Sequence, residues 1–115
     1  MSGQELSLFD AGVVDYVVVA ADGNAVQMVL VDGMDWSDAA LHEELLAAKV
    51  TAYLELARDG RIRDILSKLG HVMGPAKSLR VTIRVISRFA MPPEVGASLV
   101  GRAADRGVEL TSEVK

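Results

Sequence analysis

Residues 13–32, VVDYVVVAADGNAVQMVLVD, decide the fold of this chain. Residues 13–20 are rich in β-branched side chains and predict a strand, and Ala25 to Asp32 predict a second one. The Ala21-Asp22-Gly23-Asn24 segment between them contains an Asp-Gly pair, which favours a tight turn because both central residues of such turns can need positive φ. We therefore expect an antiparallel hairpin.

A long helix is expected directly after the hairpin, from Ser37 to Asp59, with Gly60 following its C-terminus. Asp35 or Ser37 can cap its N-terminus, and Asp38 lies in the first turn, where the helix dipole favours an acid. At about 100° per residue, one apolar face contains Leu41, Leu45, Ala48, Ala52 and Leu56. A second set widens that face into an apolar arc: Leu46, Val50, Tyr53 and Ala57. So wide an arc indicates burial against a sheet and a second surface.

The remaining sequence predicts a short helix, a strand, a helix and a last strand. Residues 61–69 form the short helix, which Gly70 ends, and residues 71–78 form a loop. Residues 79–89 alternate as in a strand with one covered face (Leu79, Val81, Ile83 and Val85) and one wet face (Arg80, Thr82, Arg84, Ile86 and Arg88). The next helix begins at residues 92–94 and ends at Gly107, with an apolar stripe of Val95, Leu99, Val100 and Ala103. Residues 108–114 predict an edge strand.

The element order is therefore ββα(α)βαβ. The fold class expected from it is α+β, a two-layer sandwich in which helices cover one face of a sheet of about four strands. The whole chain, residues 1–115, forms a single domain. If the last two strands are neighbours and parallel, the helix between them must cross over in the right-handed sense.

Composition excludes several classes of function. The 115 residues include no cysteine, which rules out disulfides, thiolate zinc sites and a cysteine nucleophile. The net charge of −4 argues against a general affinity for nucleic acid, which normally needs a basic surface. No apolar run approaches the roughly 20 residues of a membrane span, and the N-terminus lacks a signal-peptide pattern. We expect a cytoplasmic protein without cofactor or metal.

Three polar residues lie inside the apolar arc of the long helix: His42, Lys49 and Tyr53. A buried ammonium group needs an acid or water, and the nearby acids that can pair with Lys49 are Asp15, Asp32 and Asp35. One interpretation is a ligand-binding site where the helix meets the hairpin, formed by these three residues with Trp36 and Asp35, in which His42 acts as acid, base or anion contact. The other is a structural hydrogen-bond network.

A second group, Arg80, Arg84 and Arg88, forms a stripe on the wet face of the third strand, which Arg102 or Lys77 can extend. Arginines at this spacing can bind a carboxylate-rich partner or a phosphate. The alternative is a solvated face whose arginines pair with Glu109 and Glu113. No Gly-x-Ser-x-Gly elbow is present, so a catalytic serine is not indicated.

From Asp32 to Ile62 the chain resembles a family of small uncharacterised bacterial proteins, a domain of unknown function. The shared pattern is an acid-Trp turn, here Asp35-Trp36, followed by a helix of the form H-x-x-L-L-x-x-K-x-x-A-Y-L that ends in Gly. It is matched by His42, Leu45-Leu46, Lys49, Ala52-Tyr53-Leu54 and Gly60, but Ala47 and Thr51 stand where the family tends to have amides. The resemblance implies the same compact α/β fold and no known activity.

Three functions remain open. The wide apolar arc, the edge strand and the lack of a convincing catalytic set favour a non-enzymatic protein-interaction module, working as a homodimer. The second is a small-molecule binder or minor enzyme that uses His42, Lys49 and Tyr53. The third is an inhibitor or immunity-type protein whose arginine stripe binds an acidic partner.

Overall fold

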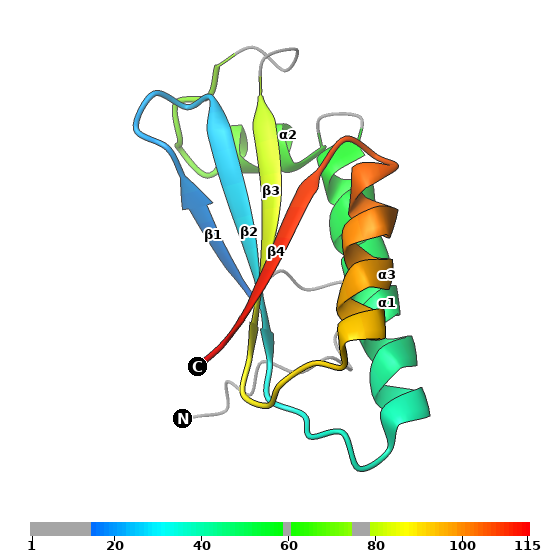
Figure 1. The fold of residues 1–115 in the computed structure, drawn as a ribbon. Coiled ribbons are helices and arrows are strands. Elements are labelled where there is room, and N and C mark those ends of the chain that lie inside the picture. Colours follow the sequence, from blue (N-terminus) through cyan, green and yellow to red (C-terminus); the bar gives the residue numbers. More distant parts are fainter. Residues whose placement is uncertain (1–14, 59–60, 75–78) are drawn as a thin grey trace.

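The computed structural model describes residues 15–58, 61–74 and 79–115, which form four strands and three helices, arranged as in Figure 1. The strands are β1 (Tyr16–Val19), β2 (Ala25–Asp32), β3 (Arg80–Ser87) and β4 (Glu109–Val114). The helices are α1 (Ala39–Ala57), α2 (Arg61–Lys68) and α3 (Pro93–Ala104). The predicted α+β class and element order are confirmed.

The four strands form one sheet in the order β1-β2-β3-β4. The predicted hairpin is confirmed, because β1 pairs with β2 in antiparallel fashion. Strands β2, β3 and β4 are parallel neighbours, so α1 with α2, and then α3, each connect two adjacent parallel strands. The last strand is at an edge of the sheet, as predicted. It is the parallel neighbour of β3, so α3 is a crossover helix between these two strands.

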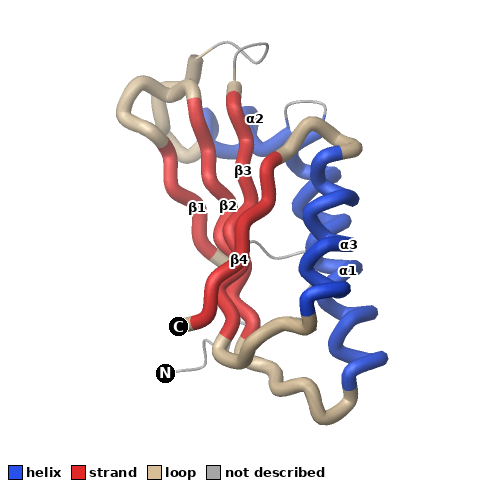
Figure 2. The backbone as a smooth tube through the Cα atoms, viewed as in Figure 1, coloured by secondary structure: helices blue, strands red, loops and turns tan. Residues whose placement is uncertain are grey.

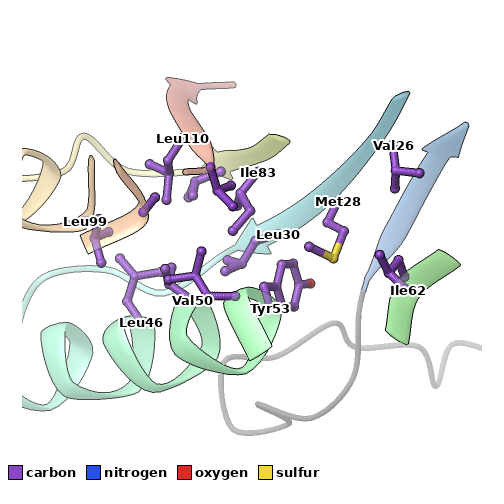
Figure 3. Close-up of a cluster of buried hydrophobic side chains, with 14 of the residues drawn as sticks. Val26, Met28, Leu30, Leu46, Val50, Tyr53, Ile62, Ile83, Leu99 and Leu110 are labelled. Atoms are coloured by element: carbon purple, nitrogen blue, oxygen red, sulfur yellow. The ribbon is translucent and has the colours of Figure 1, made fainter. Parts of the chain in front are cut away.

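The helices lie on one side of the sheet, and the core fills the space between the two layers (Figure 2). Every second residue of the central strands faces this core, as Met28, Leu30 and Ile83 show in Figure 3. The helices contribute Leu46, Val50 and Tyr53 from α1 and further residues from α2 and α3: Ile62, Leu66, Val95, Leu99 and Ala103. Val100, predicted in the α3 stripe, is instead 45% exposed, because α3 contacts the sheet over a narrower face.

The buried face of α1 differs from the predicted one. Its buried residues are His42, Leu46, Lys49, Val50, Tyr53 and Leu54. The predicted centre of the face is at its margin, since Leu41 is 37% exposed and Ala48 is also exposed, while Leu45 and Ala52 are half-buried. The real face is therefore rotated by roughly a third of a turn. Apolar side chains surround much of α1, so hydrophobicity alone does not fix its orientation.

The N-terminus of α1 also corrects the sequence prediction. Asp38, expected in the first turn, is the cap itself, and its side chain accepts a hydrogen bond from the backbone N–H of Leu41 at 3.1 Å. Asp35 and Ser37 instead form a small turn before the helix, in which both the Ser37 N–H and its hydroxyl donate to Asp35. The predicted helix end at Asp59-Gly60 and the strand start at residues 13–14 lie outside the described residues.

Candidate functional site

The first polar cluster forms where β2 ends. Asp32 is the last residue of β2, and one of its carboxylate oxygens lies 2.6 Å from Nε2 of His42 on α1. The other oxygen accepts the backbone N–H of Met34 at 3.0 Å. Both side chains are buried, with His42 0% and Asp32 1% exposed. The connection from β2 to α1 therefore returns the chain so that the two groups meet inside the protein.

Both ring nitrogens of His42 have partners. Nδ1 lies 2.9 Å from the backbone carbonyl oxygen of Asp35, which can only accept, so Nδ1 donates. Nε2 then contacts the Asp32 carboxylate. Trp36 stacks on the imidazole, with ring centroids 3.6 Å apart and an angle of 21° between the planes. Both ring nitrogens thus contact groups of the protein itself, and these contacts hold the β2–α1 connection in place.

The second polar cluster lies two turns further along α1. The Lys49 ammonium group is 2.8 Å from Oδ1 of Asp15, and both side chains are buried. The second carboxylate oxygen of Asp15 accepts the Val31 N–H at 2.8 Å. Of the three acids considered for Lys49, Asp15 forms this ion pair, while Asp32 pairs with His42.

Tyr53 completes this cluster. Its hydroxyl group accepts the backbone N–H of Asp15 at 2.9 Å and donates to the carbonyl oxygen of Val29 at 3.2 Å. Burial raises the pKa of Tyr53 well above its ordinary value. His42, Lys49 and Tyr53 thus each link α1 to the hairpin through a buried hydrogen bond. This is the geometry of the structural network, and the binding of a ligand by these residues stays a prediction.

Asp35 lies at the surface, unlike the other members of the predicted ligand site. Its carboxylate accepts two hydrogen bonds from Ser37, and these hold the pKa of Asp35 below its ordinary value. Its contribution to the His42 cluster is its backbone carbonyl oxygen alone. The five predicted ligand residues are therefore divided: Asp35, Trp36 and His42 meet at the end of β2, whereas Lys49 and Tyr53 belong to the Asp15 cluster.

Two buried polar atoms near the end of the sheet have no hydrogen-bond partner among the described residues: Nε1 of Trp36 and Oγ of Ser87. Ser87 is 3% exposed and is the register partner of Asp32 in the neighbouring strand. Ser87 was not among the candidate residues predicted from the sequence. The alternation of residues 79, 81, 83 and 85, which face the core, nevertheless indicates that residue 87 is buried on the same face, and that residue is polar.

The arginine stripe lies on the face of the sheet opposite the helices. Arg84 contacts Glu113 of β4 through Nη2 at 2.7 Å, and this contact holds the pKa of Glu113 below its ordinary value. Arg80 and Arg88 are exposed, and Arg88 lies 5.9 Å from the centre of the Phe89 ring. Arg102 does not extend the stripe, because it is on α3, where its guanidinium group reaches Thr51. Lys77 lies outside the described residues.

Within residues 15–58, 61–74 and 79–115, no three His, Asp or Glu side chains are placed to hold a metal ion. None of the helices formed by these residues combines the length and the apolar character that a membrane crossing requires.

Comparison with known proteins gives one family. No curated protein and no solved structure matches the chain. One family, described as "Family of unknown function (DUF6572)", matches residues 6–111, which is nearly the whole sequence. The chain is therefore a member of DUF6572, a family of unknown function.

Proposed function

We propose that this protein is a non-enzymatic interaction module of the bacterial cytoplasm that works as a homodimer. Its contact surface is the open face, defined as the side of the sheet turned away from the three helices. The observation that supports this proposal is the apolar character of that face at β1, where Tyr16 and Val18 are 56% and 55% exposed. Monomeric proteins rarely leave large apolar groups together on a sheet without a partner.

The open face is organised in rows that cross the sheet. One row contains Tyr16, Val29, Arg84 and Thr111, of which Val29 is only 5% exposed. The next row contains Val18, Gln27, Thr82 and Glu109. In both rows the residues of β1 and β2 are uncharged, whereas those of β3 and β4 include Arg84 and Glu109. A surface that combines apolar groups with charges of both signs can pair with a copy of itself, as a twofold contact requires.

The open face also has a shape that suits a copy of itself. A hollow of about 220 Å³ is lined by Val18, Gln27, Thr82 and Arg80, among others. Tyr16 projects one row away from it. A twofold axis between the two rows places each Tyr16 ring over the hollow of the other protomer. The volume is sufficient, since a cavity of about 150 Å³ accepts benzene.

The size of the face predicts a weak dimer. Strands about 4.8 Å apart and about 20 Å long give a four-stranded face of roughly 400 Å². Two such faces bury at most roughly 800 Å², because part of the face, such as Val29, is already buried in the protomer; this is below the 1,000 Å² or so of most stable complexes. We therefore expect a micromolar dissociation constant and a monomer at nanomolar concentration.

Sedimentation equilibrium over a wide concentration range tests this proposal. The Val18→Lys substitution places a charge in the contact and is expected to weaken self-association at least tenfold. Val72→Lys is the matched control, because Val72 is 85% exposed in the loop after α2. Circular dichroism checks that both variants fold. A strict monomer at millimolar concentration, or an equal effect of the two substitutions, refutes the proposal.

Tyr16→Ala separates the dimer from other protein partners. It removes the side chain that is placed over the hollow and is expected to weaken the dimer without changing any charge. If the parent protein stays monomeric and an acidic partner from the native cell binds it in an Arg84-dependent manner, the inhibitor or immunity-type function replaces the homodimer.

A further inference from the structure

A second hollow, of about 210 Å³, lies on the helix side of the sheet, at the end opposite the Asp32 cluster. It is enclosed by three parts of the chain: the C-terminal end of α1, the start of β3 and the turn between α3 and β4. Its position separates it from the open face. None of the residues discussed above as ligand or partner candidates lines it.

The floor of this hollow is apolar and its rim is basic. Leu54, Ala57, Leu79, Val81 and Val108 provide the apolar lining. The two charged residues among its described lining residues are both arginines, Arg58 and Arg106. They come from different elements, one at the end of α1 and one after α3, so the fold brings them together over one apolar surface.

Glu55 contacts both arginines. Its carboxylate oxygens lie 3.2 Å from Nη1 of Arg106 and 3.7 Å from Nη1 of Arg58. Among the described residues, no second acid contacts Arg106. The helix C-termini at this end bring partial negative charge, which arginines offset. The Arg106 guanidinium group has five N–H donors, and its contact with Glu55 is made through Nη1 alone.

We propose that this hollow binds a small carboxylate with a compact apolar body. The apolar body lies on Leu54, Val81 and Val108, and the carboxylate takes hydrogen bonds from Arg106, with Arg58 beside it. Sites for drug-sized ligands have volumes of about 300–1,000 Å³, so a hollow of 210 Å³ suits a smaller molecule. A ligand of that size is expected to bind with a millimolar to high-micromolar dissociation constant.

Two-dimensional amide NMR of the full chain, titrated with hexanoate, tests the proposal. Saturable shifts are expected for Ala57, Gly107 and Val108, and hexanamide, which has the same body without the charge, is expected to produce none. The Arg106→Gln substitution is expected to weaken hexanoate binding about fivefold, as for a half-exposed charge-assisted hydrogen bond. Glu55→Gln removes the competing acid and is expected to strengthen binding about threefold. These opposite signs are not expected from a loss of stability.

Two further variants make the result decisive. Arg102→Gln removes the same charge from α3 outside the hollow, and binding is expected to stay unchanged. Ala57→Leu keeps both arginines and fills the hollow, so it is expected to abolish binding. Absence of saturable shifts, equal binding of hexanoate and hexanamide, or equal losses in the Arg102 and Arg106 variants overturns the proposal.

Discussion

Replacing Lys49 by Met gives the sharpest test of the buried network. The ammonium group of Lys49 and the carboxylate of Asp15 are 2.8 Å apart, with 0% and 1% of their side chains exposed. Met has a similar length and no charge, so the substitution keeps most of the packing. It leaves the Asp15 carboxylate in the interior without the cation that it contacts.

The expected loss of stability is large. Removing one partner of a buried ion pair destabilises a protein by about 3–5 kcal/mol. The whole free energy of unfolding of such a domain is about 5–15 kcal/mol, so the substitution is expected to remove at least about a fifth of it. The melting temperature is expected to fall by more than about 10 °C. Urea unfolding followed by fluorescence of Trp36, the single tryptophan, measures the change.

The double variant Asp15→Asn with Lys49→Met is the control. It removes both charges, and the amide oxygen of the introduced asparagine can still accept the Val31 N–H. We therefore expect it to be more stable than Lys49→Met alone, by about 1–3 kcal/mol. A Lys49→Met variant within about 1 kcal/mol of the parent protein, or a double variant less stable than the single one, refutes the assignment of a buried ion pair.

Three further predictions concern single positions. Gly23→Ala is expected to destabilise the protein by at least about 1 kcal/mol in thermal melts, because Gly23 has a φ of 72° and an added Cβ meets the Val72 carbonyl oxygen. Gly33→Ala is the control, because the space around its Cβ is open, and its stability is expected to stay unchanged. Tyr53→Phe is expected to lose about 1–3 kcal/mol at neutral pH, because two buried backbone groups lose their partner. The raised pKa of Tyr53 stabilises the parent fold below pH 10 or so and this contribution is lost as the pH rises further, so the stability difference narrows in alkaline urea melts. Arg84→Met is expected to raise the pKa of Glu113 towards its ordinary value, as a carboxyl-carbon NMR titration measures.

The fold was predictable from the sequence because the local signals agree with the tertiary structure. The second strand was predicted with its observed bounds, Ala25 to Asp32, since β-branched residues and the Asp-Gly turn both indicate a hairpin. The alternation of residues 79–89 identified the buried side of β3 correctly, because one face of the sheet is covered and the other is not. Because successive side chains of a strand point to opposite faces of the sheet, assigning one residue to a face also assigns the others.

The orientation of α1 was not predictable in the same way, for a physical reason. The choice between its faces depends on long-range partners: His42 is buried because Asp32 pairs with it, and Lys49 because Asp15 does. From hydrophobicity alone, His42 and Lys49 are unfavourable in the core. Each can be buried there because an aspartate carboxylate pairs with it. The candidate cluster was thus found from its residue types, but its division into two networks needed the structure.

The topology explains why this polar cluster is closed. In open sheets with helices on both faces, ligands bind at the carboxyl ends of parallel strands, where neighbouring connections leave in opposite directions and open a crevice. Here both connections between parallel strands pass over the same face, so they do not leave in opposite directions at Asp32 and Ser87. The hollow of about 170 Å³ that Ser87 lines at this end lies against β4, not against Asp32. The β2–α1 connection instead stacks Trp36 on His42 at this end. Binding is therefore expected where the two layers leave surface uncovered, on the open face and at the rim formed by Arg58 and Arg106. If a ligand changes amide chemical shifts only around Trp36, at the other end of the sheet, this expectation is wrong.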